Sequence, residues 1–578
     1  MAATAPTKSV YAFSAPRGAS APDLAHFRQR YPETVASLGA LPRREEWLRR
    51  VWELEARWQT VWAARDGGTA EEVVVRGAAP QGSFVEGEFD VIYAGGAAAL
   101  LHAAALACAH NRRVLVFGER GAGGACGNWN LSDDEMRRLE SVGLFTRDEL
   151  KSAVVNRYRG GFVKFHDAAS RVKAEPLWVD GASDVAVDGE RLVALATEKL
   201  RRCVAKGCAI LEGLRFVRAH VESSRVIVEA EDARGARRFF AARLFADAGD
   251  ADSPVARQLN GGRAPSHVCP VVGTIARGFA RGESNDAADF GVGEILVSTE
   301  DASAHRQLFW EGFAGSKARG EYATRLFFYD SVDSRADKSL LALFERYFES
   351  LPAYKRRGAG WRVELPLFGY APAARQGWRS RRRTASERVM LLGDAAGGSS
   401  ALAPRGVGAV ARDLKRVARL VHLALEADIS DAESLASICD GGPRVASAVG
   451  LSEFMRPAPK GAPSSVNETL NAFVAALAGL DERVRRELFE GRMTAGALRR
   501  LVARTVRLYP RIFARVRERF GARGTLWWLA GVGEALWSER RSRRVAAQDA
   551  DAARVEDPAR EFERFAAGHG DTGLRSDG

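Results

Sequence analysis

The sequence predicts an α/β fold in which a Rossmann-like parallel sheet is joined to a β-rich domain and carries helical additions at both ends. A buried strand, an Ala- and Leu-rich helix and a second strand follow one another over residues 89–117, which makes one βαβ unit. A late strand at 389–392 runs through a Gly-Asp turn into another helix. Between these segments, residues 268–329 carry the apolar pattern of strands, which predicts a second domain.

Length and composition fit a large soluble protein with several structural units. The chain has 578 residues, of which 46% are hydrophobic and 27% are charged. These values are ordinary for globular proteins and exclude a mainly disordered, collagen-like or polytopic membrane chain. No apolar run approaches the roughly 18 residues that a membrane-spanning helix needs, so we expect no transmembrane segment.

The chain is basic, and the excess charge is concentrated toward its C-terminus. Lys and Arg together number 85 against 73 Asp and Glu, and many of the arginines lie between Arg483 and Arg544. A nucleic-acid-binding protein usually adds a recognition motif to such a charge, and none is visible. We therefore expect peripheral contact with an anionic membrane surface and no nucleic-acid partner.

Cysteine and histidine indicate neither a metal site nor a disulfide framework. The six cysteines show neither Cys-x-x-Cys spacing nor the density of a secreted scaffold, so we interpret them as reduced packing residues. His102, His166, His220 and His305 are scattered without the spacing of metal ligands. We therefore predict no metal site.

The two ends of the chain differ in composition from the rest. Residues 1–22 contain no Asp or Glu and are rich in Ala, Ser, Pro and Thr, which is typical of a plastid transit segment. An exposed N-terminus without a targeting role explains the same composition. Residues 23–85 carry apolar residues at helical spacing between Arg and Glu, which predicts a helical N-terminal segment. The polar tail at 546–578 is expected to be disordered.

The main domain is expected over residues 86–425, with its two ligand-binding segments at 90–120 and 389–425. A substrate domain is expected as an insert at about 255–385, and a helical C-terminal region over 426–545. The late segment then returns the chain to the βαβ unit after the insert.

A Gly-rich turn between the first strand and its helix is a candidate phosphate-binding loop. Small residues there let the backbone approach a pyrophosphate, and the helix N-terminus offers N–H groups and the positive end of its dipole. An acidic residue at the end of the next strand can bind a ribose hydroxyl. The residues at these positions are Gly95, Gly96, Ala99, Glu119 and its neighbour Arg120. Ala94 stands where this motif usually has its first Gly, so helix–strand packing alone is the other interpretation.

A second candidate segment lies far along the chain, where a short apolar strand is followed by a Gly-Asp turn and a helix. The Asp can bond the ribityl chain of a flavin while the following helix N-terminus faces the phosphate or the ring. The early and late segments together favour FAD over NAD as the bound dinucleotide. The predicted residues are Gly393, Asp394, Ala395, Gly406 and Gly408, with Asp247 and Gly249 at the end of another predicted strand.

Several blocks outside these motifs carry a family resemblance over roughly residues 85–540. They are Trp129-Asn130-Leu131-Ser132, Leu177-Trp178-Val179, Val271-Val272-Gly273, Arg277-Gly278-Phe279, Gln307 to Phe313, and the late segment from Gly393 to Leu414. In this order they resemble the CruA/CruP-type lycopene cyclases, most closely the CruP type. The resemblance implies an FAD-binding fold of the p-hydroxybenzoate hydroxylase and geranylgeranyl reductase kind, in which Trp129 and Asn130 contribute to the cofactor site.

The same resemblance implies a substrate and a location. It implies a lycopene-like carotenoid substrate and a photosynthetic membrane, hence a thylakoid-associated plastid protein, or otherwise one at the periphery of the cytoplasmic membrane. We expect reduced FAD to be the active form, with NAD(P)H as a candidate electron source.

Five positions depart from the family pattern. Asn128 and Asp133 stand where Glu and Arg are usual, and Ala401, Pro404 and Arg405 stand where Pro, Phe and Gly are usual. Loss of a positive side chain and of a flexible Gly beside a cofactor predicts weaker or altered flavin binding. A non-catalytic carotenoid- or flavin-binding photoprotective paralogue is therefore an alternative to an active enzyme.

Glu311 is the candidate catalytic acid. Cyclisation, as the resemblance implies it, is redox-neutral: a proton adds to an end-group alkene, the carbocation closes the ring, and a neighbouring proton leaves. A Glu in an apolar aromatic pocket has a raised pKa, which suits a general acid, and an aromatic face stabilises a cation. Glu311 lies between Trp310 and Gly312, with Phe309 and Phe313 nearby. Strict strand alternation gives the other interpretation, in which Trp310 and Phe313 are core residues and Glu311 faces water.

A flavin monooxygenase or prenyl reductase that uses NAD(P)H shares the FAD motifs and is the rival enzyme class. The sequence has no Trp-x-Trp-x-x-Pro block of a flavin halogenase. Redox turnover and redox-neutral cyclisation therefore both remain open at the level of sequence, and NAD(P)H consumption distinguishes them.

Overall fold

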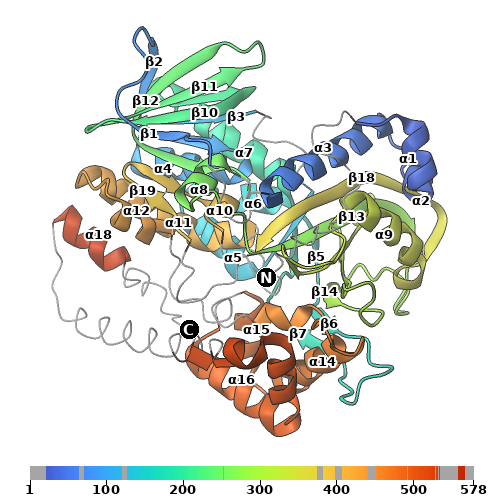
Figure 1. The fold of residues 1–578 in the computed structure, drawn as a ribbon. Coiled ribbons are helices and arrows are strands. Elements are labelled where there is room, and N and C mark those ends of the chain that lie inside the picture. The colour runs from blue at the N-terminus through green and yellow to red at the C-terminus, as the bar shows by residue number, and fades with distance from the viewer. Residues whose placement is uncertain are drawn as a thin grey trace, which may run out of the picture.

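The computed structural model shows three parts: a sheet with its helices, a second sheet, and a group of C-terminal helices beside it (Figure 1). The structure describes residues 21–63, 70–119, 127–250, 253–373, 382–397, 407–439, 451–490, 493–526, 529–530, 533 and 557–566.

The first part is built on a mainly parallel sheet. Its parallel strands, in spatial order, are β9 (Ala209–Glu212), β3 (Val114–Gly118), β2 (Val85–Gly95), β12 (Arg237–Ala248) and β20 (Val389–Leu391). The further strands are β10 (Leu214–Val221), β11 (Val226–Asp232), β1 (Val74–Arg76) and β19 (Ala385–Ser386). The apolar runs in β2 and β3 are buried, as expected for central strands of a parallel sheet with helices on its faces.

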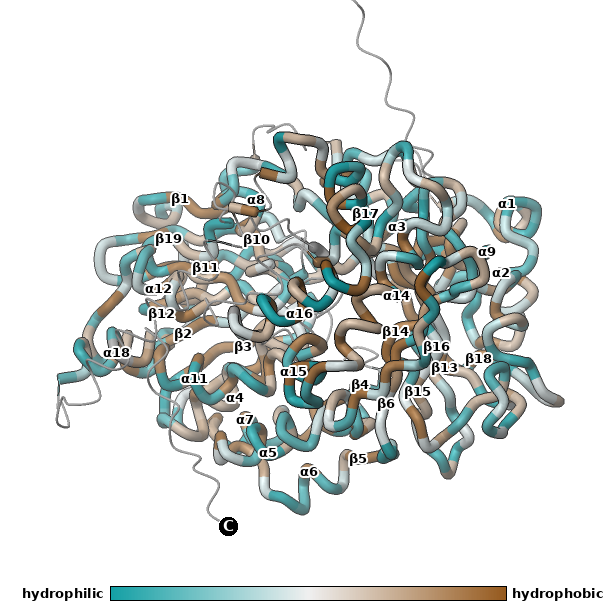
Figure 2. Tube along the Cα trace, turned by 90° about the horizontal axis from the view of Figure 1, so that it is seen from below, coloured by the Kyte–Doolittle hydropathy of each residue, from teal (hydrophilic) through white to brown (hydrophobic). Residues whose placement is uncertain are grey.

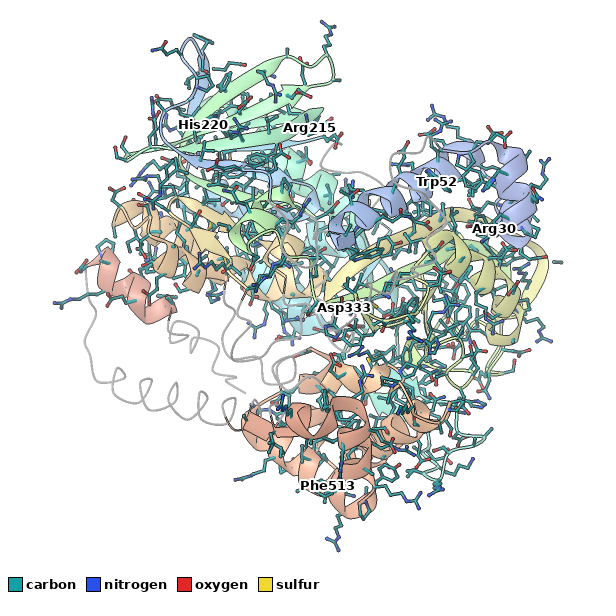
Figure 3. The ribbon with its side chains drawn as sticks, in the orientation of Figure 1. Arg30, Trp52, Arg215, His220, Asp333 and Phe513 are labelled. Carbon is teal, nitrogen blue, oxygen red and sulfur yellow. The ribbon has the colours of Figure 1, made fainter. Side chains whose placement is uncertain are left out.

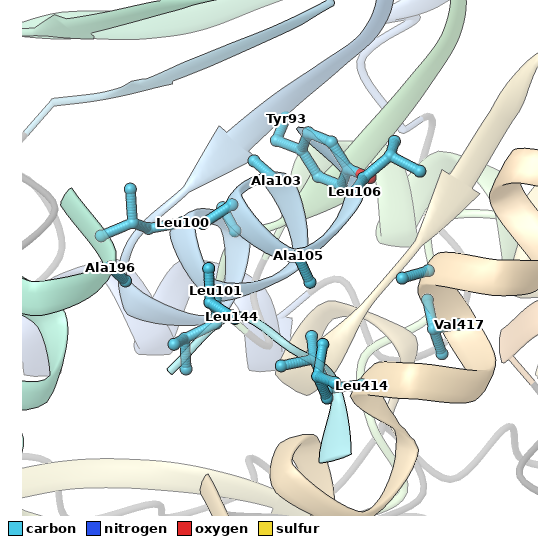
Figure 4. Packing of buried hydrophobic residues seen from close by; sticks show 14 of the residues in the cluster. Tyr93, Leu100, Leu101, Ala103, Ala105, Leu106, Leu144, Ala196, Leu414 and Val417 are labelled. Carbon is cyan, nitrogen blue, oxygen red and sulfur yellow. The ribbon is translucent and has the colours of Figure 1, made fainter. Parts of the chain in front are cut away.

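The longest helices described in this part are α4 (Ala97–His110), α7 (Gly189–Arg201) and α11 (Val407–Glu426). α4 contacts the sheet and both other helices, which explains why its sequence is apolar nearly all round. Figure 4 shows Leu100 and Leu101 of α4 in the core that also contains Leu414 of α11. β2, α4 and β3 form the βαβ unit that the sequence predicts.

Shorter elements connect and flank these layers. The helices are α5 (Asp133–Ser141), α6 (Arg147–Ala153), η1 (Val204–Lys206), α8 (Pro254–Leu259), α10 (Gly393–Ala396) and α12 (Ala432–Cys439). A small antiparallel sheet consists of β4 (Asn128–Leu131), β8 (Val185–Asp188) and β5 (Val154–Arg157). Ser132 and Thr146 begin α5 and α6 with capping boxes, in which the hydroxyl and a Glu three residues later each satisfy a backbone N–H.

The second part is an eight-stranded, mostly antiparallel sheet. Its strands, in spatial order, are β17 (Asp330–Ser331), β13 (His267–Phe279), β16 (Glu321–Phe327), β15 (Phe309–Ala314), β14 (Gly293–Val297), β6 (Gly161–Lys164) and β7 (Leu177–Val179), with β18 (Arg357–Ala373) also paired to β13. The predicted insert at 255–385 supplies most of this sheet. β6 and β7 come from the earlier segment 161–179, so the sheet is not a single insert.

One face of the second sheet is covered by α9 (Leu340–Tyr354) and by the N-terminal helices α1 (Leu24–Arg30), α2 (Pro32–Ser37) and α3 (Arg44–Ala63). The core here is aromatic, with Trp310 stacked on Tyr354 at a centroid distance of 4.4 Å. Glu55 of α3 reaches this interface and accepts hydrogen bonds from the Ser339 hydroxyl and the Leu341 N–H. The helical spacing of the N-terminal segment thus corresponds to helices that pack on the second sheet.

The opposite face carries the C-terminal helices. These are η2 (Leu451–Met455), α14 (Ser465–Ala478), α15 (Glu482–Phe489), α16 (Ala495–Leu508) and a helical stretch at 512–526. Apolar side chains of β6 and β14 pack against α14, α15 and α16, and Figure 2 shows β14 as an apolar segment. A small cavity of about 30 Å³ remains between them, lined only by apolar side chains such as Phe165, Leu296 and Phe473.

Two buried carboxylates anchor these helices through ion pairs and hydrogen bonds. Glu453 of η2 contacts His267 at 2.8 Å, Arg456 at 3.0 Å and Arg519 at 3.3 Å. Burial opposes ionisation, but the His267 and Arg456 contacts outweigh it and lower the pKa of Glu453 to about 2. The second carboxylate, Glu468 of α14, accepts a hydrogen bond from the Tyr509 hydroxyl.

The tail contains a helix where disorder was expected. α18 (Pro558–Ala566) packs against α11, with Phe562 buried and Glu561 paired with Arg419 at 2.6 Å. The prediction of disorder is wrong for these residues because Phe562, Phe565 and Ala566 form an apolar stripe within an otherwise polar sequence. Among the described residues, no helix combines the length and hydropathy needed to cross a bilayer.

Candidate functional site

The carboxyl ends of β2, β12 and β20 lie side by side and carry the predicted glycines and aspartate. Ala248 of β12 pairs with Gly95 of β2, and Leu391 of β20 pairs with Asp247. The Leu392 N–H donates to the Asp247 carbonyl at 2.8 Å. Ligands of parallel α/β sheets bind outside the carboxyl ends of the strands. The early and late candidate segments therefore share one edge of the sheet.

Gly95 is required by the close approach of two of these strands. Its φ is +140°, a conformation that side chains rarely adopt, and a Cβ there would lie 2.6 Å from the carbonyl carbon of Ala248. The obstacle is backbone, which cannot rotate away. Gly95 thus serves the packing of β2 against β12.

Gly96 has different surroundings. It is the N-cap of α4, and this cap has no side-chain hydrogen bond. Among the residues that the structure describes, a Cβ at Gly96 would meet no atom within 4 Å, so the space beside it is open. The first-turn N–H groups and the positive end of the helix dipole lie at this space, which suits a phosphate.

The late turn packs against the first turn of α4. Gly393 has φ +57°, and a Cβ there would lie 3.6 Å from the Cβ of Ala98. Asp394 follows on the exposed side of α10, whereas Ala395 is buried. The predicted ribityl partner therefore lies close to the N-terminus of α4.

Asp247 organises the loop that follows β12. One oxygen of this buried carboxylate accepts from the Gly249 N–H at 2.9 Å, and the other accepts from the Ser253 hydroxyl. Ser253 in turn caps α8 through the Ala256 N–H. The side chain of Asp247 thus holds Gly249 and the α8 N-terminus in place, and a direct cofactor contact by either residue stays a prediction.

Arg382 is a residue at this edge that sequence reasoning missed. A Cβ at Gly397, at the end of α10, would lie 3.1 Å from the Arg382 side chain. Burial lowers the pKa of Arg382, and the nearby Asp247 opposes that shift. The available signal was the run of arginines just before the late strand, which composition alone did not assign to the site.

The remaining predicted residues of the two candidate segments differ in their burial, and some lie outside the described residues. Glu119 is exposed directly after β3, where a ribose-binding acid belongs. Ala99 is buried in α4 and allows the helix to pack closely on the sheet. Arg120, Gly406 and the divergent positions Ala401, Pro404 and Arg405 lie outside the residues that the structure describes.

Trp129 and Asn130 lie on β4, in the small sheet between the two larger parts. Trp129 is partly buried against the core of the first part. The Asn130 side-chain oxygen accepts from the Tyr158 hydroxyl at 3.4 Å. A Cβ at Gly127, just before β4, would lie 3.4 Å from the Ile275 side chain of the second sheet. The Trp-Asn block therefore marks the junction of the two sheets, and its cofactor contact stays a prediction.

A buried ion pair joins this block to the late segment. Glu135 of α5 accepts from the Ser132 N–H at 2.8 Å and is paired with Arg412 of α11. A Cβ at Gly408 would lie 2.6 Å from the Glu135 carboxylate. Gly408 thus makes room for this pair, a packing role that the motif alone did not reveal.

Glu311 lies on β15 directly opposite Arg325 of β16, and the two side chains form an ion pair at 3.3 Å. Burial raises the pKa of Glu311, while the Arg325 guanidinium opposes that shift. Trp310 points to the other face, into the core with Tyr347 and Tyr354. The expected aromatic pocket with Trp310 beside Glu311 is therefore wrong, because successive residues of a strand face opposite sides of the sheet.

The face that carries Glu311 looks toward the junction of the molecule's parts. Glu311 lies level with Gly273 of β13, across the intervening strand. On the same face, Val271 packs against the C-terminal helices, and Ile275 lies against Gly127 before β4. Glu311 is thus placed between the C-terminal helices and the segment that leads into β4.

The described residues provide two chemical functions. The edge formed by α4, β12 and α10 can hold a phosphate-containing, elongated ligand. The Glu311–Arg325 pair places one titratable carboxyl group on the inner face of the second sheet. No group of three His, Cys, Asp or Glu side chains in the described part of the chain is arranged to hold a metal ion.

Comparison with known proteins gives structural matches only. No family model matches the sequence, and no curated protein sequence does so either. The halogenase PltM in complex with ethyl mercury and mercury matches with a TM-score of 0.51 and 16% identity over 83% of this chain and 96% of that one.

Two further solved structures have lower scores. A geranylgeranyl bacteriochlorophyll reductase-like protein from Thermoplasma acidophilum matches with a TM-score of 0.48 and 12% identity, over 75% of this chain and 99% of that one. The p-nitrophenol 4-monooxygenase PnpA from Pseudomonas putida DLL-E4 matches with a TM-score of 0.48 and 16% identity, over 72% and 99%. The predicted α/β fold with a Rossmann-like parallel sheet is confirmed, and this chain shares its fold with the halogenase PltM.

Proposed function

We propose that this chain is a flavoprotein that binds FAD along the edge formed by α4, β12 and α10. The observation that carries the proposal is the open space beside Gly96, bounded by an uncapped helix N-terminus and by the Gly393–Asp394 turn. A glycine in open space has no packing reason to be glycine, whereas a cofactor phosphate gives it one.

The residues present fit FAD in the following roles. The α4 N-terminus and Gly96 would hold the pyrophosphate, Glu119 the ribose of the adenosine half, and Asp394 the ribityl chain. When bound, FAD would supply a ring that carries electrons or, in its reduced form, negative charge. Arg382 adds a positive charge at the same edge, which favours an anionic ligand.

The reaction that we propose is the redox-neutral cyclisation of a lycopene-like carotenoid end group. Its support is the resemblance of the Trp-Asn and Phe-Trp-Glu blocks together with the position of Glu311 at the junction of the parts. The Glu311 carboxyl would give its proton to an end-group alkene, so that a C–H bond forms and a carbocation remains. Ring closure moves the positive charge, and a proton from a neighbouring carbon returns to the carboxylate.

One observation favours the rival redox class. Arg325 pairs with Glu311 and stabilises its ionised form, which is the wrong state for an acid. If this pair is structural, the same FAD site would serve an NAD(P)H-dependent monooxygenase or prenyl reductase. Steady NAD(P)H consumption by the purified protein with an isoprenoid or aromatic substrate would support that class.

The product test uses a lycopene-accumulating bacterial host. Cells would express the wild-type chain, Glu311→Gln or the control Glu364→Gln, which alters a carboxylate on β18 of the same sheet. We expect cyclised carotenoid from the wild type and the control, and none from Glu311→Gln at equal flavin content. Equal product from all three would remove Glu311 from the mechanism. No product from any, with flavin bound and no NAD(P)H turnover, would favour a non-catalytic paralogue.

A further inference from the structure

The outer end of the C-terminal helices exposes large apolar side chains. Leu508 ends α16 and is 48% exposed, and Phe513, just after the turn, is 63% exposed. Figure 3 shows Phe513 at the tip of this part, far from the first sheet. We call the exposed residues at this turn, Arg507, Leu508, Arg511, Phe513 and Arg517, the basic tip.

The exposure is a property of the helix faces. α16 buries Leu498 and Leu501, and the following helical stretch buries Ile512 and Val516. These side chains already supply the buried apolar contacts of the two helices, so the helices do not need Phe513 for folding. Leaving a side chain of this size in water forfeits the stabilisation that burial gives, so its exposure beside Leu508 indicates an interaction surface.

The charge around these side chains is almost entirely positive. Among the described residues from 493 to 530, Glu518 is the one acidic residue, and it is paired with Arg515 at 2.8 Å. Arg515 and Arg519 turn inward to Glu468 and Glu453. Arg500 is paired with Asp481 at 3.2 Å. The other exposed arginines of this segment are Arg499, Arg504, Arg507, Arg511, Arg517 and Arg523.

We propose that the basic tip binds an anionic phospholipid surface, with Leu508 and Phe513 entering the interface and the arginines contacting headgroups. Arg is suited to this arrangement because its stem can lie along hydrocarbon while its guanidinium reaches the headgroups. Leu526 and Leu529, 69% and 50% exposed, continue the apolar character along the chain. Leucines gain nothing from stacking on bases, so these residues favour lipid over nucleic acid.

This inference does not depend on flavin binding or on any reaction. Its test is co-sedimentation of the full chain with vesicles of phosphatidylcholine alone or mixed with phosphatidylserine, at low and high salt. We expect binding to the anionic vesicles only, and we expect high salt to weaken it.

Two variants and one matched control separate the contributions. Leu508→Ser with Phe513→Ser removes the apolar contacts and is expected to weaken vesicle binding about tenfold or more. Arg507→Gln with Arg511→Gln is expected to weaken it by a similar factor and to reduce its salt dependence. Phe84→Ser alters an aromatic side chain that is 78% exposed beside β2, in the first part, and should leave binding unchanged.

Circular dichroism would verify that each variant is folded, as their exposed positions predict. The proposal is overturned if the wild type stays in the supernatant with anionic vesicles, or if it binds neutral vesicles equally well. It is also overturned if Phe84→Ser weakens binding as much as the tip variant does. Tight binding of a single-stranded oligonucleotide that vesicles do not displace would instead indicate a nucleic-acid surface.

Discussion

The two adjacent glycines of the predicted phosphate loop are required for different physical reasons. The sequence motif predicts both Gly95 and Gly96 as one loop, because both are small residues at a strand-to-helix turn. The structure separates them: backbone of β12 excludes a side chain at Gly95, whereas no atom of the described part of the chain excludes one at Gly96. The distinction depends on the pairing of β2 with β12, which lies far along the chain and has no local signature.

Gly95→Ala should destabilise the protein, and Gly96→Ala should not. The first change forces φ +140° on an Ala and places its Cβ against Ala248, which costs about 1–3 kcal/mol. The second adds a methyl group to open space. Thermal unfolding followed by circular dichroism checks this, with Gly96→Ala as the matched control. Equal unfolding temperatures for the two variants would contradict the assigned roles.

The Glu311–Arg325 pair gives a second prediction at the level of residues. Arg325→Met removes the cation that opposes the effect of burial, so the pKa of Glu311 should rise further. Because the raised pKa favours the protonated folded state, stability should fall as the pH rises above the ordinary Glu value of 4.5. We expect a loss of about 1–2 kcal/mol at neutral pH, since an unpaired carboxylate is left half-buried.

Urea unfolding at several pH values measures that loss. The loss should disappear in acid, where the carboxyl group is protonated in both folded and unfolded chains. The double variant Glu311→Gln with Arg325→Met should recover much of the stability at neutral pH. A loss that is independent of pH would show that Arg325 acts through packing alone.

At the scale of elements, local patterns were predictable and distant pairings were not. The strand–helix–strand of β2, α4 and β3 follows from an apolar run, a glycine turn and a second apolar run. β6 and β7 join the second sheet through a parallel pairing with β14, and no local signal shows where a short strand pairs. α18 was missed because its apolar stripe is short and becomes visible only against α11.

Buried polar residues inside helical patterns were also not predictable. Glu55 of α3 stands in a helix whose polar positions mostly face water, yet it lies in the interface with α9. Burial raises its pKa to about 8, against the bonds from Leu341 and Ser339, which lower it. Sequence periodicity predicts the helix but not that one of its acidic residues caps another helix.

Glu55→Gln should remove a pH dependence of stability. A folded pKa of about 8 lies above the ordinary value of 4.5, so this group's contribution is complete below pH 4.5 and is lost as the pH rises through 8. Gln keeps the acceptor for Ser339 and Leu341 but cannot ionise. The difference in unfolding temperature, variant minus wild type, should therefore be larger at about pH 8.5 than at about pH 5. The first pH lies about half a unit above the folded pKa of about 8, and the second lies about half a unit above the ordinary value of 4.5.

Calorimetry of the wild type and of Glu55→Gln across this pH range measures the difference in unfolding temperature. A variant that tracks the wild type at every pH would show that Glu55 remains ionised in the folded protein. Glu45→Gln is the control, because that residue lies in the first turn of the same helix and is exposed.

At the scale of the whole molecule, the fold class was predictable and the placement of the C-terminal helices was not. The βαβ unit and the late Gly-Asp segment predict the first sheet, because both features occur where a parallel sheet requires them. The C-terminal helices cover the face of the second sheet opposite α9, and they are anchored by Glu453 and Glu468 (Figure 1). Both carboxylates are ordinary acidic residues in the sequence, and only their burial reveals this role.

This arrangement also determines where chemistry can take place. The flavin edge belongs to the first sheet, Glu311 belongs to the second, and β4 lies at their junction. The FAD binding, the cyclisation and the membrane contact that we propose fall on separate parts of the chain, so each can be altered without the others.

The central claim is that the space beside Gly96 holds the pyrophosphate of FAD. Titration of the purified, flavin-free chain with FAD, followed by quenching of flavin fluorescence, tests it most directly when wild type and Gly96→Val are compared at equal folded content. We expect saturable binding to the wild type and a loss of at least about tenfold in affinity for the variant, with an unchanged unfolding temperature. Equal affinity for both proteins, or no binding to the wild type, would contradict the account.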